Sequence, residues 1–250
     1  MEIFNEQPVD WRDLQVKVAQ IFEGMGCSVE VEKDVETVRG IVNIDVHILD
    51  NSSFPAMKYI CECKYWNTSV PKTIVHSFRT VVNDYGASAG FLIAKIGFQS
   101  GAFEAAKNSN VQLLDWNEFT SLVDDRWIES LVDKMDNIGR ALRVYTNPLD
   151  GRCYERAKAL GSDQLIRYNH LCHEYEVISY QCLRVLYIDP GERVSKENIN
   201  IIIENVKSNI EELKDVSSYH EYFHTIIDLC SNGLMKFDFL FGERMQKYMV

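Results

Sequence analysis

The sequence lacks three features that would each define a class of protein. No apolar run is long enough to span a bilayer, and the first residues, which include Glu2, Glu6 and Asp10, do not resemble a signal peptide. The seven cysteines are odd in number and occupy apolar contexts such as Cys61 and Cys182, so no disulfide framework is expected. We therefore expect a soluble, cytoplasmic protein with reduced thiols and no membrane partner.

Positive charge is also scarce, because 26 Lys and Arg stand against 37 Asp and Glu and give a formal net charge of −11. Phosphate contacts need Lys and Arg, so this balance argues against nucleic-acid binding over the whole surface. It is compatible with a local basic cleft or with a partner that supplies further contacts. The length of 250 residues allows one large or two modest domains.

One predicted strand carries charges where a buried strand is usually apolar. Residues 59–66 read Tyr-Ile-Cys-Glu-Cys-Lys-Tyr-Trp. Because side chains alternate along a strand, Glu62 and Lys64 share one face, about 7 Å apart. Such an acid and lysine pair is common on exposed sheet faces, but here Cys61 and Cys63 fill the alternate positions. The pattern favours a functional site inside a buried strand.

A second predicted strand, at residues 43–48, carries an acid that can meet the first. Alternation places Asp45 and His47 on one face of this strand and the three apolar residues Ile44, Val46 and Ile48 on the other. If the two strands pair, Asp45 and Glu62 converge. Two carboxylates and a main-chain carbonyl form the oxygen-only partial shell that Mg²⁺ prefers, and Mn²⁺ can substitute. Lys64 would then orient or deprotonate the attacking water, or neutralise charge on the phosphorane.

The order of elements around these residues resembles the Mrr-like restriction endonuclease branch of the PD-(D/E)XK nuclease superfamily, over about residues 8–120. Before the two acid-bearing strands, an amphipathic helix over 10–23 leads into a strand over 27–31. After them come a helical run over 75–82, a strand over 90–94, a helix that begins within 97–102 and a strand over 111–115. The resemblance implies an α/β, restriction-endonuclease-like fold with a mixed sheet flanked by helices.

By position, the resemblance implies that Asp45 and Glu62 bind the metal and that Lys64 is the catalytic lysine. The main-chain carbonyl of Cys63 would be a further metal ligand. Many relatives carry a glutamate on the first helix at a position where this chain has Gln15. A neutral amide there can still contact water, but it lowers the negative charge of the site and puts a second metal in doubt.

Other residues are candidates to support this site. Glu23 lies two turns after the glutamine on the first helix and is an uncertain substitute for the acid. His47 is either a partner of Asp45 or a core residue, and His76 is a candidate to position substrate or water. The basic residues that would line a cleft with the catalytic lysine are Arg39, Lys72, Arg79 and Lys95.

The remaining polar clusters have simpler structural interpretations. The segment His170–His173 and the pair His220 and His224 lack the paired Cys-x-x-Cys spacing of a zinc site, so we interpret them as core or interface histidines. The alternate acids Glu30, Glu32, Asp34 and Glu36 are interpreted as a solvated strand face and turn. Trp66 either packs beneath the site or stacks on substrate.

Beyond residue 122, apolar residues recur at helical spacing almost throughout. We therefore expect a nuclease domain over 1–122 and an all-α domain over 123–250 for oligomerisation or partner binding. Its predicted helices are one containing residues 127–135, one over 163–186, one capped by Ser195 and one over 217–229. A turn at 147–151 ends or interrupts the segment that precedes it.

The function we expect is Mg²⁺-dependent endonucleolytic hydrolysis of DNA phosphodiester bonds. The family analogy adds a role as an effector in bacterial restriction or antiphage defence. Two alternatives stay open at this point. The domain can be an inactive relative that binds nucleic acid or a partner protein, or it can be a subunit that a partner must activate, and a homo-oligomer fits either.

Overall fold

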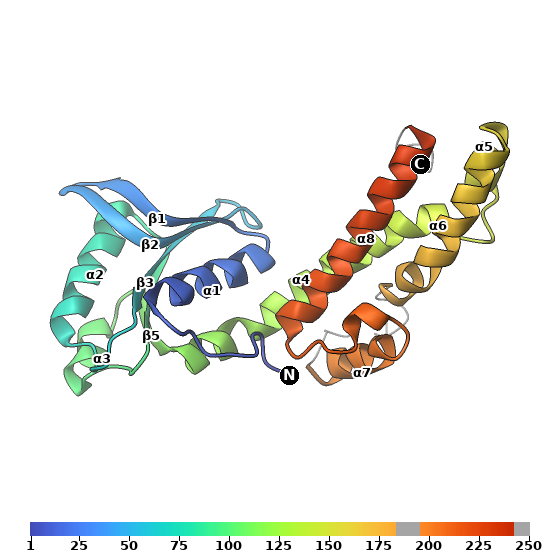
Figure 1. Ribbon diagram of the computed structural model, residues 1–250. Coiled ribbons are helices and arrows are strands. Elements are labelled where there is room, and N and C mark those ends of the chain that lie inside the picture. The colour runs from blue at the N-terminus through green and yellow to red at the C-terminus, as the bar shows by residue number, and fades with distance from the viewer. Residues whose placement is uncertain (184–195, 243–250) are drawn as a thin grey trace. The chain divides into compact units, whose positions relative to one another are not determined.

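The computed structural model describes residues 1–183 and 196–242, shown in Figure 1. The chain divides into two compact units, one of Glu6–Ser130 and one of Met1–Asn5 with Leu131–Val250. Position 122, where we expected the boundary, lies inside the helix α4 (Trp116–Thr146), which begins directly after the last strand of the sheet. Each unit is described below by itself.

The first unit is built on one five-stranded mixed sheet. Its strands are β1 (Ser28–Thr37), β2 (Gly40–Asp50), β3 (Met57–Lys64), β4 (Ala89–Ala94) and β5 (Val111–Asp115), and they lie side by side in that order. The pairs β1–β2 and β2–β3 are antiparallel, whereas β3–β4 and β4–β5 are parallel. The predicted α/β fold with a mixed sheet is therefore confirmed.

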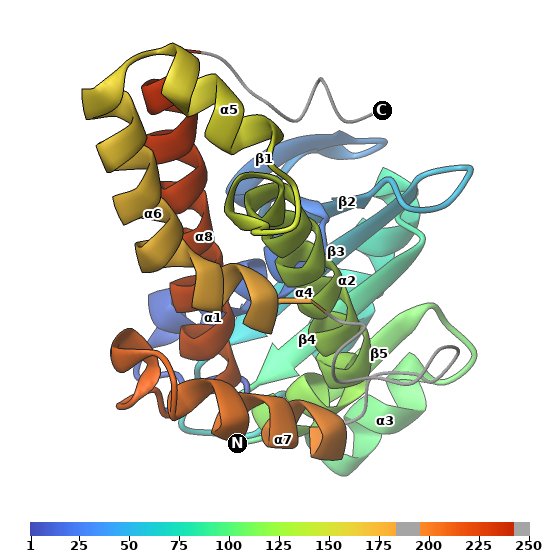
Figure 2. The same ribbon diagram turned by 90° about the vertical axis from the view of Figure 1, so that its right-hand side faces the viewer.

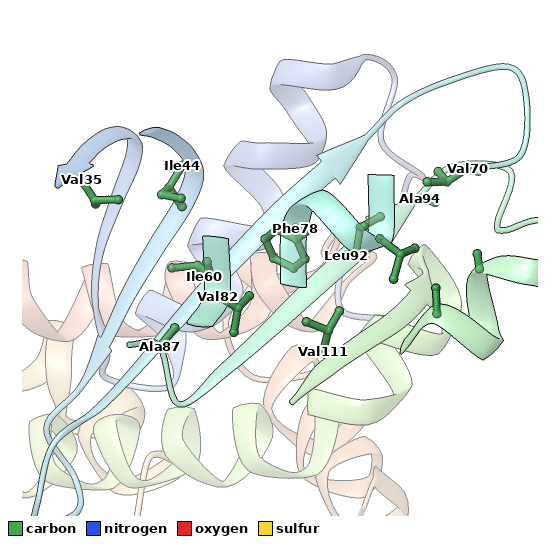
Figure 3. Packing of buried hydrophobic residues seen from close by; sticks show 13 residues of the cluster. Val35, Ile44, Ile60, Val70, Phe78, Val82, Ala87, Leu92, Ala94 and Val111 are labelled. Atoms are coloured by element: carbon green, nitrogen blue, oxygen red, sulfur yellow. The ribbon is translucent and has the colours of Figure 1, made fainter. Parts of the chain in front are cut away.

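Helices cover both faces of this sheet: α1 (Trp11–Gly24), α2 (Lys72–Tyr85) and α3 (Ser100–Ala106). On one face, the ring of Phe22 from α1 lies 6.0 Å from the ring of Phe91 on β4. The next residue of β4, Leu92, belongs instead to the apolar cluster that Phe78 of α2 forms with Ile60 of β3 (Figure 3). Both faces of β4 are therefore covered, which explains its continuous apolar sequence.

Local capping defines where the helices begin and end. The Asp10 carboxylate accepts the backbone N–H of Asp13 at 2.8 Å and starts α1. Asp115 and Glu118 exchange side-chain to backbone hydrogen bonds of 2.8 Å in both directions, which is a capping box at the start of α4. The C-terminus of α2 closes on Gly86 in the left-handed conformation, with φ 68°.

The parallel strands all end at one edge of the sheet. Lys64, the last residue of β3, lies beside Ala94 of β4, which in turn lies beside Asp115 of β5. The loop after β3 is tied to the loop after β4 by hydrogen bonds of 2.9 and 3.0 Å at Val70. Side chains at the carboxyl end of β3 therefore project from a fixed edge.

The expected alternation along β2 fails in its middle. Ile44 lies in the cluster under α2, yet the His47 Nε2 also points to α2, where it lies 2.9 Å from the Tyr85 hydroxyl. Two residues separated by three positions cannot both face α2 in a regular strand. The prediction that Ile44 shares a face with Val46 and Ile48 is therefore wrong, because β2 is distorted between these residues.

The second unit is helical among its described residues, with α5 (Arg152–Ala159), α6 (Ser162–Gln181), α7 (Lys196–Lys207), a 3-10 turn η2 (Glu211–Leu213) and α8 (Tyr219–Phe241). The helices α6 and α8 lie side by side (Figure 2). Their core is centred on Phe237, whose ring stacks on Tyr145 of α4 at 4.9 Å and meets the edge of Tyr168 at 6.1 Å. The sequence therefore builds an aromatic core here.

Two predicted helix ends in this unit are wrong. The helix α8 does not end at Leu229 but continues to Phe241, and its Gly233 packs against Tyr175, leaving no room for a side chain. Gly233 therefore serves helix packing and not a turn. The helix α6 ends at Gln181, short of Leu186, and Ser195 lies outside the described residues.

Two backbone hydrogen bonds join the N-terminal residues to the helical unit. The carbonyl groups of Glu2 and Ile3 accept hydrogen bonds from the backbone N–H groups of Tyr219 and His220, both at 3.0 Å, which ties the first residues to the start of α8.

All seven cysteines of the chain are free thiols. Within the described residues, none of the helices combines the length and apolar character needed to traverse a bilayer.

The close approach of α2 to β4 at Gly90 gives a stability prediction. A Cβ atom at this position would lie 2.5 Å from Val82 and 2.8 Å from Phe78. We expect Gly90→Ala to lower the free energy of unfolding by about 1–3 kcal/mol through overpacking, seen as a lower urea midpoint. Gly101→Ala is the matched control, because its Cβ would have ordinary contacts of 3.5 Å or more. Equal midpoints for both variants would contradict this packing.

Candidate active site

The carboxyl end of β3 brings an acid and a lysine together. Glu62 and Lys64 lie on the same face of this strand, and the Lys64 ammonium forms an ion pair with Glu62 Oε1. Both side chains are mostly covered, with 24% of Glu62 and 17% of Lys64 exposed. The ion pair neutralises one charge in a setting where an isolated charge would be costly.

Asp45 lies close to Glu62 and Lys64 because the pairing of β2 with β3 ends just before it. The β2–β3 pairing runs from Asp50↔Met57 to Val46↔Cys61 and stops there. Beyond it, the Asp45 Oδ2 accepts the backbone N–H of Cys63 at 2.6 Å, so that a side chain replaces the missing backbone partner. This hydrogen bond places the Asp45 carboxylate beside the residue between Glu62 and Lys64.

The buried amide of Gln15 approaches the same carboxylate from α1. Gln15 is only 3% exposed, and its amide favours the ionised form of the Asp45 carboxyl, which opposes the rise of that group's pKa. Its Nε2 also donates to Glu32 Oε1 on β1 at 2.6 Å. The structure therefore brings four of the predicted residues, from three elements, close together and adds Glu32 to them.

Burial and like charge make both carboxylates of the site reluctant to ionise. Burial raises the pKa of Asp45 above its ordinary value of 3.8, against the opposing effects of the Cys63 N–H and Lys64. Burial also raises the pKa of Glu62 above 4.5, the Asp45 charge raises it further, and Lys64 lowers it only in part. The site therefore holds negative charge that one lysine does not balance.

These donors fit a hard divalent cation. Carboxylate oxygens are the ligands that Mg²⁺ and Mn²⁺ prefer, and an added cation would relieve the repulsion between Asp45 and Glu62. In residues 1–183 and 196–242, no group of three or more His, Cys, Asp or Glu side chains is placed to hold a metal ion. A site here would therefore use two carboxylates and leave its other positions to backbone carbonyl and water oxygens.

Three predicted residues are engaged elsewhere in the unit. His47 contacts the Tyr85 hydroxyl at 2.9 Å and Lys33 Nζ at 3.4 Å, and its pKa is lowered, mainly by burial. The Arg79 guanidinium donates to the Ala105 carbonyl at the end of α3, at 2.6 Å. Arg39 pairs with Asp84 at 2.9 Å; because it lies six residues from Asp45, it is about 20 Å away along β2.

Other predicted residues lie exposed on neighbouring elements. His76 and Lys72 are exposed on α2, and Glu23 is exposed near the end of α1. Lys95 is on the loop after β4, and its Nζ lies 3.0 Å from Asn67 Oδ1 and 4.2 Å from the Tyr65 ring, both on the loop after β3. Trp66 is 39% exposed, and Lys64 Nζ lies 5.5 Å from the centre of its ring, so this residue is not fully packed beneath the site.

Glu32 is the residue that sequence reasoning missed. We interpreted it as part of a solvated strand face with Glu30, Asp34 and Glu36, because the four acids alternate. In the structure, Glu32 is exposed but its carboxylate accepts a hydrogen bond from the Gln15 amide, and it has φ 53° at the point where the pairing of β1 with β2 skips one residue. Alternating acids carry no signal of such a local break, so only three-dimensional contacts reveal it.

The fold and this constellation define a nuclease-like domain, and comparison with known proteins identifies its family. Residues 7–123 match the family model Mrr_cat, described as restriction endonuclease. Over these residues the chain therefore matches an Mrr-like restriction endonuclease domain of the PD-(D/E)XK superfamily, as its resemblance indicated.

The other comparisons add little. No curated protein matches the chain. A crystal structure of the protein of unknown function AF1548 matches with 13% identity and a TM-score of 0.38, over 94% of this chain and all of the other. Such a likeness carries no argument about this chain.

The raised pKa of Glu62 gives a pH-dependent stability prediction. A carboxyl whose pKa is higher in the folded than in the unfolded state destabilises the fold as pH rises above its unfolded value, here 4.5. We therefore expect Glu62→Gln to melt at a higher temperature than wild type at pH 7 in a chelator, and this difference to shrink below pH 4.5. Glu36→Gln, on the exposed part of β1, is the control and is expected to leave the melting temperature unchanged. A Glu62→Gln variant less stable than wild type at pH 7 would contradict the assignment.

Proposed function

We propose that the protein is a Mg²⁺-dependent endonuclease that hydrolyses DNA phosphodiester bonds. The observation that carries this proposal is the convergence of Asp45 on the carboxyl end of β3, where its carboxylate bonds the Cys63 N–H between Glu62 and Lys64. The Mrr-like domain over residues 7–123 supports the reaction class.

In this proposal Asp45, Glu62 and the Cys63 carbonyl hold the cation. A bound Mg²⁺ would make the attacking water more acidic and offset charge on the scissile phosphate. Lys64 has a mostly covered ammonium at the same point, and cation binding would loosen its ion pair with Glu62. Its Nζ would then donate a hydrogen bond to a phosphate oxygen or to the attacking water.

The residues that would contact the DNA backbone lie around the carboxyl end of β3. We propose Lys72 for this role because it is exposed at the start of α2. We propose Lys95 because it is exposed on the loop after β4, where its Nζ contacts Asn67 on the loop after β3. Arg39 and Arg79 would reach phosphate only by giving up their contacts with Asp84 and the Ala105 carbonyl. His76, exposed one turn from Arg79, would position substrate or water.

The biological context we propose is cleavage of foreign DNA in bacterial restriction or antiphage defence. This context is supported by family analogy, because sites and not folds determine the reaction. We also propose that the helical half assembles the protein with a second copy or with a partner that contributes DNA contacts. The net charge of −11 supports a need for such added contacts.

A pair of lysine variants on one strand tests the catalytic assignment. Lys64→Met is expected to reduce cleavage of supercoiled plasmid in Mg²⁺ or Mn²⁺ about 100-fold or more, since it removes the only cation of the constellation. Lys58→Met is the matched control, because Lys58 also lies on β3 but contacts the Tyr85 carbonyl and ring. Linear duplex and single-stranded DNA, tested in parallel, define the substrate form.

The outcomes separate the alternatives. Cleavage that survives in Lys64→Met and in Glu62→Gln would contradict the proposal and point to a contaminating nuclease. Wild-type protein without cleavage, activated by a co-purified partner, would establish a partner-activated subunit. Inactivity with any partner, together with metal-independent DNA binding, would identify an inactive relative.

A further inference from the structure

We propose that Glu32 supplies a third carboxylate charge to the cation site and that Gln15 holds it in place. This inference rests on the proposed function, because it concerns the same site that Asp45 and Glu62 form. It assigns a positioning role to an exposed strand residue that the sequence pattern places on a solvated face.

The first support is the buried amide between the two acids. The Gln15 Nε2 donates a hydrogen bond to the Glu32 carboxylate at 2.6 Å, and the same amide favours the ionised form of Asp45. Gln15 is 3% exposed, so its position is fixed by packing. One buried side chain therefore contacts Glu32 and acts on the charge of Asp45.

The second support is the backbone at Glu32. The β1–β2 register runs through Val31↔Val46 and Lys33↔Ile44, and it skips Glu32 and Asp45 between them. Glu32 has φ 53°, a left-handed conformation that costs a non-glycine residue free energy and persists only where the surroundings hold it. The distortion that turns Glu32 toward Gln15 is the same one that breaks the alternation of β2.

The third support is the balance of charge. With Glu32 included, three carboxylates face one ammonium, that of Lys64, which leaves a formal charge of −2 for a divalent cation. The negative charge of Glu32 acts on both Asp45 and Glu62, since it contributes to the raised pKa of each. The charge of Glu32 therefore acts on both carboxyl groups that would bind the cation.

Glu32 acts on the cation at longer range than Asp45 and Glu62 do. Its side chain is exposed, and the described residues include no three acids arranged as direct ligands. Mg²⁺ usually keeps several waters, and residues that contact such waters tune the affinity of a site. Glu32 would thus attract the cation and accept hydrogen bonds from its water shell.

Binding of Mn²⁺ alone to the full-length protein tests this role, measured by electron paramagnetic resonance. Glu32→Gln keeps an oxygen that accepts the Gln15 amide but removes the charge, so we expect about tenfold weaker binding with an unchanged melting temperature. A residue that served only to pack Gln15 would leave the affinity unchanged. Glu36→Gln, on the same strand, is the matched control and is expected to bind as wild type does.

A second variant moves the charge to the helix. The double variant Gln15→Glu with Glu32→Gln keeps the net charge of the site, and we expect it to recover most of the Mn²⁺ affinity that Glu32→Gln loses. Wild-type affinity in Glu32→Gln, or no recovery in the double variant, would overturn the inference.

Asp45→Asn separates this inference from the proposed function. Loss of Mn²⁺ binding in Asp45→Asn, with full binding in Glu32→Gln, would leave the proposed function standing and refute the role of Glu32. Absence of Mn²⁺ binding in the wild-type protein would overturn both.

Discussion

The hydrogen bond from the Cys63 N–H to the Asp45 carboxylate is the contact on which the site depends. It forms where β2 stops pairing with β3, and it fills the backbone position that the departing strand leaves open. The sheet can therefore separate at its edge without an unsatisfied buried N–H group. The same hydrogen bond holds Asp45 of β2 beside Glu62 and Lys64 of β3. The end of the β2–β3 pairing therefore also positions the residues of the candidate site.

This arrangement costs stability in the absence of a cation. Burial disfavours the ionised forms of Asp45 and Glu62, and their proximity adds repulsion that Lys64 offsets only in part. Proteins retain such strained electrostatics where function requires them. The surrounding core, with Ile60, Leu92 and Phe78 packed between the sheet and α2, supplies the stability that the polar edge does not (Figure 3).

Much of this could be predicted from the sequence, because it depends on local pattern. The order of elements follows from periodicity, whereas the mixed sheet and the Mrr-like domain follow from the family resemblance that this order and the residues around Glu62 and Lys64 carry. The face of Ile44 and the place of Glu32 could not be predicted, since both depend on a backbone break that alternating residues do not encode. The full length of α8 was also missed, because Gly233 packs against Tyr175 inside a helix that continues to Phe241.

The site assignment itself stays a prediction until a cation is located. The most direct measurement is an anomalous diffraction map from crystals of the full-length protein grown with Mn²⁺. The account predicts an anomalous peak between the carboxylates of Asp45 and Glu62, within ligand distance of the Cys63 carbonyl oxygen. A well-ordered site without such a peak, or a peak bound only by other residues, would contradict it.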